Sequence, residues 1–283
     1  MIDVSLWERD YKSQASGARS KYWLNEPTQD SVDSVKYLFK LPTEGTGGHW
    51  AEFIASRIGR DLEFDTADIW LAKNREDIGI ISKNFRLPTE SFYEGGDLFY
   101  SFYPDFDRGS LAYYELPNIL KLLKTYRLQE AFSVIPVFDT LIANNDRHCD
   151  NWGILQDKNN IKMSPIYDNG SSLGFNVKIS QKEKMLTDKR MLKGFCNRGK
   201  PCIGLPQIKK PKHFQLLLYL QHHYPIVLEK TIGKINNLNK QIILSVLNKI
   251  PDECMNEVEK SWVLQLLLYR KAWILDWYKE GVR

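Results

Sequence analysis

Asn144-Asn145-Asp146-Arg147-His148-Cys149-Asp150-Asn151 and, further along, Tyr167-Asp168-Asn169-Gly170 are the stretches that decide the fold of this chain. The residues between them predict a short strand over 152–156, a turn over 157–160 and a returning strand over 161–167. Such a hairpin would bring Asn151 and Asp168 back to the same end. The sequence therefore predicts one polar site built from two separate segments.

The residue types in these stretches are those that phosphoryl transfer requires. Asp146 and Asn151 are five residues apart, which is the interval between the base and the metal-binding Asn in the catalytic loop of protein kinases. Magnesium prefers oxygen ligands, and the amide of Asn151 and the carboxylate of Asp168 would supply two. Asp146 would stay outside the metal shell to orient and deprotonate an acceptor hydroxyl. The alternative is that both stretches are ordinary turns, because Asn, Asp and Gly are common in loops.

The composition is that of a soluble globular protein. The 283 residues are 43% hydrophobic and 26% charged, and this length could hold one bilobed enzyme or two small domains. No apolar run approaches the ~20 residues of a membrane span. The N-terminus lacks the charged and apolar pattern of a secretory signal. We therefore expect a cytoplasmic protein with no membrane partner.

The four cysteines are expected to be reduced thiols, because they form no C-x-x-C pair and no zinc-like arrangement with the histidines. One of them, Cys149, lies in the loop that carries Asp146. A spacer role is expected there rather than a nucleophile, since only His148 could activate the thiol. The others are Cys196, Cys202 and Cys254.

Positive charge is concentrated between Lys178 and Lys212. This basic segment contains eleven Lys or Arg residues and two acids, a net charge of +9, so the rest of the chain carries −5. It could dock an anionic partner, including nucleic acid or a protein bound to nucleic acid. A solvated loop is the alternative, and the single aromatic residue, Phe195, offers little stacking platform for single strands. Direct nucleic-acid binding is therefore not expected.

The first third of the chain predicts mainly strands. A small-residue loop that includes Ser16, Gly17 and Lys21 precedes a strand over 22–24. Backbone amides of such a loop can hold phosphates, although it lacks a G-x-G-x-x-G pattern and could be a simple turn. A second strand ends at Lys40. A Lys that faces the nucleotide from a strand is the usual kinase anchor for phosphates, although alone it would be interpreted as a surface residue.

One helix is predicted in this third, over residues 49–58, with Gly59 as its stop. Glu52 lies in its first turns, where it could pair with Lys40 and hold the ammonium group toward the phosphates. The alternative is an acid that is simply favoured near a helix N-terminus. A buried strand over 78–82 follows, and the chain after it could be a hinge between lobes.

The rest of the chain predicts a larger helical part. Nine aromatic residues lie within 92–114; they could wall an adenine or substrate pocket, but core packing is the favoured interpretation. Helices are expected near 116–123 and 128–143, the second kinked by Pro136, and again over 214–220, 230–249 and 257–278. The predicted fold class is α+β, with a small β-rich N-lobe over 1–90 and a larger α-helical C-lobe over 91–283.

These features together resemble the HipA-type serine/threonine kinases, a bacterial family best known for the toxins of toxin–antitoxin modules. The resemblance covers most of the chain; it is specific in the catalytic loop and around Asp168, and loose over 16–21. It implies a bilobed protein-kinase-like fold that uses ATP and Mg²⁺. It also implies that the catalytic base is Asp146, the magnesium ligands are Asn151 and Asp168, and the ATP-binding residues are Ser16, Gly17, Lys21, Lys40 and Glu52.

The resemblance further implies phosphorylation of Ser or Thr in a protein, with autophosphorylation in residues 16–20. An aminoacyl-tRNA synthetase or another translation component is the implied substrate, and an antitoxin protein is an implied partner. Long members of the family carry an additional N-terminal subdomain before the kinase core. Because Lys40 comes too early to leave room for it, the chain resembles the shorter, stand-alone members.

Two other functions remain open. The pattern Asp146-Arg147-His148-x-x-Asn151 is also similar to the D-R-H-x-x-N loop of phosphatidylinositol kinases, in which the His takes part in catalysis. The basic segment could then contact a lipid headgroup, but no amphipathic membrane helix or lipidation signal stands out. For His148, a role in bracing the loop is expected. The second alternative is a pseudokinase or binding module, and the joint presence of base, metal ligands, lysine and glutamate argues against it.

Overall fold

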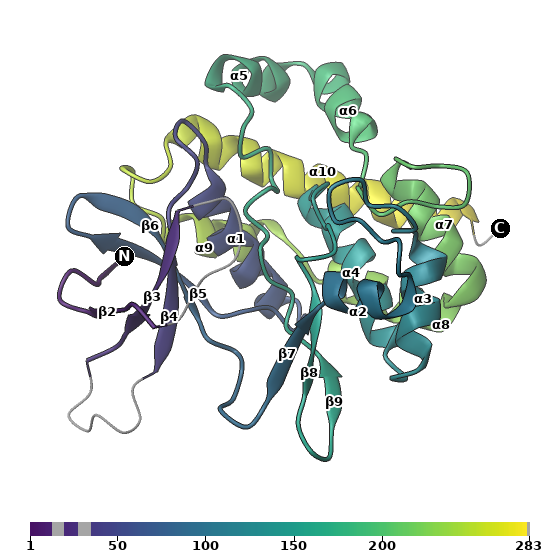
Figure 1. Cartoon of the computed structure of the whole chain (residues 1–283). Coiled ribbons are helices and arrows are strands. Elements are labelled where there is room, and N and C mark those ends of the chain that lie inside the picture. Colours follow the sequence, from purple (N-terminus) through teal and green to yellow (C-terminus); the bar gives the residue numbers. More distant parts are fainter. Residues whose placement is uncertain (13–19, 28–34, 282–283) are drawn as a thin grey trace.

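Nine strands and ten helices build the residues that the structure, a computed structural model, describes: 1–12, 20–27 and 35–281 (Figure 1). The strands are β1 Ile2–Asp3, β2 Glu8–Asp10, β3 Lys21–Asn25, β4 Lys36–Lys40, β5 Ile69–Asn74, β6 Asp77–Lys83, β7 Ser91–Glu94, β8 Gly153–Gln156 and β9 Ile161–Met163. The helices are α1 Gly48–Asp61, α2 Gly95–Phe102, α3 Leu116–Lys124, α4 Gln129–Ile142, α5 Ile179–Thr187, α6 Lys189–Arg198, α7 His213–His223, α8 Pro225–Asn236, α9 Lys240–Leu247 and α10 Glu257–Gly281. This order confirms the predicted α+β class.

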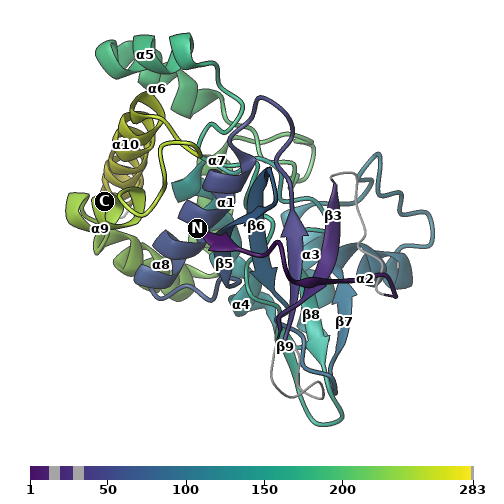
Figure 2. The same ribbon diagram turned by 90° about the vertical axis from the view of Figure 1, so that its left-hand side faces the viewer.

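A six-stranded sheet forms the N-terminal part, in the order β1-β5-β6-β4-β3-β2. Successive side chains of a strand point to opposite faces, so Ile80 joins the main core with α1 while Ile81 joins a small cluster on the other face. On β4, Tyr37 and Phe39 also belong to the small cluster. The side chain of Lys40, the next residue, therefore points to the opposite face, where it contacts Glu52 of α1. Figure 2 shows α1 beside this sheet.

α1 contains the apolar pattern that predicts it, but it does not end at the glycine. Trp50 and Ile54, four residues apart, are buried on it, as one face of an amphipathic helix requires. The helix continues to Asp61, so the predicted stop at Gly59 is wrong. A Cβ at Gly59 would clash with the side chain of Thr66, and the glycine therefore allows a close approach rather than a turn.

The predicted hairpin is confirmed as β8 and β9, which pair antiparallel in a second sheet with the order β7-β8-β9. Oδ1 of Asp157 accepts hydrogen bonds from the backbone N–H groups of Asn159 and Asn160, both at 2.8 Å, and so fixes the turn. β9 is shorter than predicted and ends at Met163. Residues 164–168 then approach the loop over 144–151, and Ile166 forms an isolated parallel bridge with Thr66 on the way.

One continuous hydrophobic core joins α1 to the helices that follow residue 95. Phe99, Phe106 and Tyr114 are buried in it, so these members of the aromatic stretch pack the core as favoured. Pro136 lies inside α4, which runs on to Ile142. Because the core crosses position 90, the division into lobes at that residue stays a prediction.

One sequence expectation for the C-terminal part is wrong, and one alternative interpretation, the solvated loop over 178–212, holds only in part. The single helix expected over 230–249 is two helices, because the side chain of Asn239 accepts the backbone N–H of Ile242 at 2.9 Å and starts α9 anew. The basic segment contains α5 and α6 rather than only a solvated loop. Asp188 caps α6 by accepting the N–H groups of Arg190 and Met191.

α5 and α6 project from the body of the molecule as an arm above α10 (Figure 1). The arm is attached through Lys182 of α5, which is 1% exposed. Its Nζ lies 3.1 Å from Oε1 of Glu259 on α10 and 5.1 Å from the ring centre of Trp50 on α1. No helix among the described residues is both long and apolar enough to cross a membrane.

Candidate active site

Lys40 is the last residue of β4 and lies on the face that α1 covers. Its Nζ is 2.9 Å from Oε1 of Glu52 and 3.3 Å from Oδ1 of Asp168. Burial acts to lower the pKa of Lys40, but the charges of Asp168 and Glu52 outweigh it and raise the pKa. The structure thus joins three predicted site residues in one ion-pair group, and this lysine stays charged at neutral pH.

Lys21 pairs with Lys40 across β3 and β4. Burial and the charge of Lys40 lower the pKa of Lys21, while nearby acids act in the opposite direction. A second lysine therefore lies beside the first, although Lys21 is the first residue of β3 and not part of the expected loop, and its role in ATP binding stays a prediction. Ser16 and Gly17 lie outside the described residues, so their contact with phosphates stays a prediction.

The predicted catalytic loop, residues 144–151, follows α4 and its C-terminal residue Ala143. Ala143 ends the helix with a φ of 56°, a left-handed conformation that turns the chain. The backbone N–H of Asp146 donates to Oδ1 of Asn144 at 3.0 Å, and Nδ2 of Asn151 donates to the backbone oxygen of Asp146 at 2.7 Å. The predicted base and the predicted metal ligand are therefore linked directly by a hydrogen bond.

Arg147 joins this loop to the segment that carries Asp168. Its guanidinium is 1% exposed and donates from Nε and Nη2 to both carboxylate oxygens of Asp139, at 3.0 and 2.7 Å. Nη1 also donates to the backbone oxygens of Asn151 at 2.8 Å and Tyr167 at 2.6 Å. Nη2 reaches Oδ1 of Asn169 at 2.5 Å. One buried side chain thus sets the spacing between the two polar stretches of the sequence.

Asp139 had no role predicted from the sequence, and Arg147 was predicted only as part of a motif. A signal was present, because Asp139 is the single charged residue between positions 131 and 145. A charge in an otherwise apolar helix requires a partner when it is buried. That partner could not be identified without the fold.

Asp168 has a φ of 54°, in the left-handed region that Asp tolerates better than most residues. The preceding residue, Tyr167, donates its hydroxyl to the backbone oxygen of Asp150 at 2.8 Å. The segment after β9 therefore returns to the catalytic loop, as the predicted hairpin requires.

The donor set near Asp168 fits a hard divalent cation. The nitrogen of the Asn151 amide is used within the loop, and its oxygen makes no hydrogen bond to any described residue. This oxygen and the Asp168 carboxylate are the ligand types that Mg²⁺ prefers. Nη1 of Arg147 donates to the backbone oxygen of Asn151 and to that of Tyr167, the residue before Asp168, and so joins the two segments that carry these residues.

A second ion-pair network, also missed from sequence, lies beside the catalytic loop. Arg108 pairs with Glu94 at 3.0 Å, Asp97 at 2.5 Å and Asp150 at 2.5 Å. It therefore ties the start of α2 to the end of the loop. The spacing of these residues in the sequence does not predict that Arg108 pairs with the three acids.

Two further loop residues behave as expected from the sequence. Burial raises the pKa of the Cys149 thiol to about 12, so little nucleophilic thiolate forms at neutral pH. Nδ1 of His148 lies 3.2 Å from the backbone N of Asp150, which can donate to it. His148 therefore braces its own loop.

Comparison with known proteins gives the family. The family model described as HipA-like C-terminal domain matches residues 13–210, more than half of the chain. Among curated proteins, no sequence matches.

Two solved structures share the fold. The proinflammatory kinase CtkA of Helicobacter pylori has a TM-score of 0.81 and 20% identity, over 98% of this chain and 95% of that one. HipA of Shewanella oneidensis MR-1, from a toxin–antitoxin system and in complex with HipB and operator DNA, has a TM-score of 0.59 and 14% identity. That match covers 94% of this chain and 65% of HipA. The predicted kinase-like fold and the HipA resemblance are both confirmed, and the chain belongs to the HipA-like C-terminal domain family.

Proposed function

We propose that this chain is a serine/threonine protein kinase that uses ATP and Mg²⁺. The observation that carries the proposal is the ion-pair group in which Lys40 lies between Glu52 and Asp168, at 2.9 and 3.3 Å. Kinases hold nucleotide phosphates and metal with a strand lysine, a helix glutamate and an aspartate arranged in this way. Membership of the HipA-like family supports the proposal.

On the nucleotide side, Lys40 would bind phosphate oxygens. Glu52 is 2% exposed and holds the ammonium group of Lys40 in place. The lysine is therefore already oriented before the nucleotide binds. Lys21 would add a second positive charge beside the first. Because these groups are buried from water on the protein side, their attraction for phosphate is stronger than at a surface.

On the acceptor side, Asp146 would align a Ser or Thr hydroxyl and accept its proton. Asn151 and Asp168 would hold Mg²⁺, which when bound neutralises charge on the transferred phosphoryl group. Asn151 also holds the backbone of Asp146 through the 2.7 Å hydrogen bond. The metal ligand and the base therefore keep a fixed relation to each other.

Transfer of label from γ-labelled ATP, with Mg²⁺ present, tests the activity. We expect the wild type to label itself or a lysate protein, and Asp146→Asn to abolish labelling. Asp276→Asn, which removes an exposed charge on α10, is the matched control and should keep wild-type activity. A wild type that is as inactive as Asp146→Asn on every protein offered would exclude the kinase and favour a pseudokinase.

Nucleotide binding tests the metal site separately from turnover. A nonhydrolysable ATP analogue with Mg²⁺ should raise the melting temperature of the wild type. Asp168→Ala should lose most of this increase, because it removes a metal ligand and a partner of Lys40. An unchanged increase in Asp168→Ala would show that the metal is held elsewhere.

A lipid kinase is the rival within the enzyme class. The hydrogen bond between His148 and its own loop and the family both favour a protein acceptor. Phosphoinositide vesicles offered together with lysate decide between a protein and a lipid acceptor. Preferential labelling of lipid would favour the lipid kinase over the protein kinase.

The substrate and partners that we propose follow the family. They are an aminoacyl-tRNA synthetase or another translation component as substrate, a toxin role, and an antitoxin protein as partner, as HipA of Shewanella oneidensis has HipB. Autophosphorylation would occur within residues 16–20. Phosphoproteomics after brief expression, compared with Asp146→Asn, tests the substrate and the autophosphorylation site together. Phosphorylated sites only in proteins outside translation would contradict the proposed substrate.

A further inference from the structure

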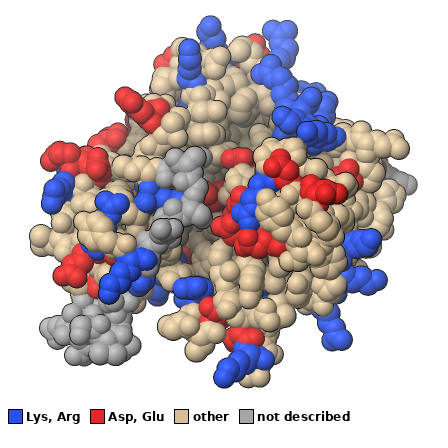
Figure 3. All heavy atoms as spheres, in the orientation of Figure 1, with Lys and Arg blue, Asp and Glu red and all other residues tan. Residues whose placement is uncertain are grey.

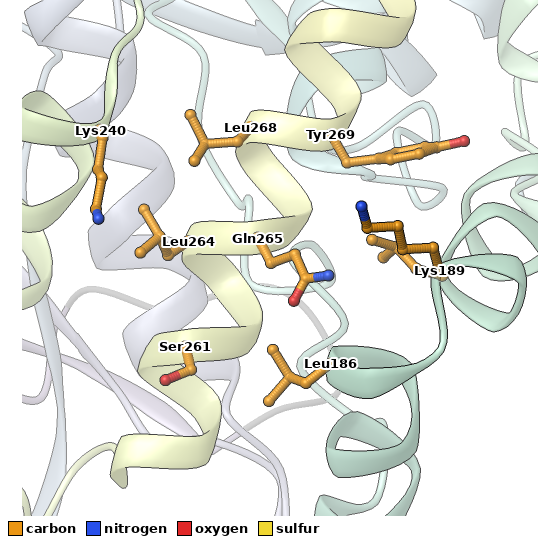
Figure 4. Close-up of a pocket in the computed structure, with 9 residues that line it drawn as sticks. Leu186, Lys189, Lys240, Ser261, Leu264, Gln265, Leu268 and Tyr269 are labelled. Carbon is orange, nitrogen blue, oxygen red and sulfur yellow. The ribbon is translucent and has the colours of Figure 1, made fainter.

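A groove of about 600 Å³ separates the arm from α10. We call it the arm groove. Its apolar lining comes from both sides, with Leu186 and Leu192 on the arm and Leu264, Leu268 and Tyr269 on α10 (Figure 4). Its volume is within the roughly 300–1,000 Å³ typical of ligand sites.

Two lysines flank this apolar lining. Lys240, at the start of α9, and Lys189, at the start of α6, line the groove and lie on opposite sides of α10 (Figure 4). The remaining lining residues are Ser261 and Gln265, so the lining has no acid. Neither lysine forms a salt bridge with any described residue. The groove is therefore apolar in the middle and positively charged at both sides.

Further positively charged residues lie near the arm groove. Lys193 lies one turn after Lys189 on α6, and both are exposed. Figure 3 shows Lys and Arg side chains gathered along the edge of the molecule that α5 and α6 occupy. The basic segment carries a net charge of +9. An anionic partner would therefore be attracted before it reaches the apolar lining.

We infer that the arm groove binds an acidic, amphipathic peptide segment of a partner protein. Leucine side chains of the peptide would pack on Leu264 and Leu268, and its Asp or Glu residues would lie beside Lys189 and Lys240. Nucleic acid fits this lining less well, because Tyr269 is its only aromatic residue and bases bind by stacking on aromatic rings. The inference does not depend on kinase activity, since none of these residues belongs to the proposed active site.

Selection from a displayed library of random dodecapeptides tests the chemistry of the ligand. The full-length wild-type chain is the target, and the most enriched peptide is then synthesised with a fluorescent label for anisotropy titrations. We expect peptides that are rich in Asp or Glu and in Leu, Ile or Phe. Peptides without acidic enrichment, or no enrichment at all, would overturn the inference.

Variants locate the binding site. The double substitution Lys189→Glu with Lys240→Glu should raise the Kd of the selected peptide about tenfold or more, because charge pairs at both sides become repulsive. The control is Lys121→Glu with Lys230→Glu, two exposed lysines of α3 and α8 outside the groove. It changes the net charge equally and should alter Kd less than about twofold. Equal weakening in both doubles would show nonspecific attraction and refute the site.

Two further measurements separate the remaining outcomes. Leu268→Gln should weaken the peptide while leaving the circular dichroism spectrum unchanged, which shows that the apolar lining is used. Random single-stranded RNA and DNA 20-mers are titrated on the same variants. If an oligonucleotide binds more tightly than the peptide and shows the same loss in the Lys189 and Lys240 variant, the groove is a nucleic-acid surface and the inference is wrong.

Discussion

Replacing Arg147 by Met should destabilise the folded protein strongly. The substitution leaves the Asp139 carboxylate, which is 4% exposed, without its charge partner. It also leaves the backbone oxygens of Asn151 and Tyr167 and the side chain of Asn169 without the donor that joins them. Removing one partner of a buried ion pair costs about 3–5 kcal/mol.

This cost can be measured as a change in melting temperature. At about 2 °C per kcal/mol for a chain of this length, the melting temperature should fall by about 6–10 °C. Arg190→Met is the matched control, because the Arg190 side chain is 95% exposed and its loss should change the free energy of unfolding by less than about 0.5 kcal/mol. Differential scanning fluorimetry without nucleotide compares the two.

A double-mutant cycle tests the reason for the loss. Asp139→Leu removes the buried carboxylate, so the Arg147→Met and Asp139→Leu double variant should be less destabilised than the two single losses predict, by about 2 kcal/mol. Additive losses would show that the two side chains act independently. A decrease in melting temperature of less than about 2 °C for Arg147→Met alone would refute the reasoning from burial.

Three further predictions follow from the described contacts. Burial, with a smaller contribution from the charge of Arg270, lowers the pKa of His213 well below its ordinary value. The unfolded chain therefore binds a proton near pH 6.5 that the folded chain does not, and the free energy of unfolding should fall as the pH drops below about 6.5. Urea midpoints at about pH 7.5 and 5.5 should differ less in His213→Gln than in the wild type, and equal differences would contradict this. Because the pKa of the Cys149 thiol is about 12, iodoacetamide at about pH 8 should leave that thiol unmodified until urea is added; mass spectrometry of the native protein detects any exception. Glu52→Gln should weaken binding of the nonhydrolysable ATP analogue, since Lys40 loses a charged partner at 2.9 Å, and unchanged affinity in calorimetry would show that Lys40 is oriented by Asp168 alone.

The sequence predicted the parts of this site that depend on local spacing. The five-residue interval from Asp146 to Asn151 and the hairpin that follows are short-range features, so pattern and turn residues were sufficient to place them. Lys40 and Glu52 were predicted from the order of a strand and a helix.

Features that depend on distant packing could not be predicted in the same way. The role of Arg147 requires the fold, because its partners come from α4, the catalytic loop and the segment after β9. Gly59 was misinterpreted because a glycine required for close packing against Thr66 has the same sequence appearance as one that ends a helix. The arm was partly misinterpreted because its many charged residues indicated solvent exposure and outweighed the short apolar face of Leu192 and Phe195, which packs on the core.

Lys182 connects the arm to the helix that carries Glu52, a residue of the proposed nucleotide site. Trp50, which lies against its ammonium group, is on the same helix and only two residues before Glu52. A displacement of α5 must therefore either break the contacts of Lys182 with Trp50 and Glu259 or move the start of α1 with it. In the second case a movement of the arm also moves Glu52, the partner of Lys40. By thermodynamic reciprocity, a nucleotide that fixes Lys40 would then slow hydrogen exchange in α5.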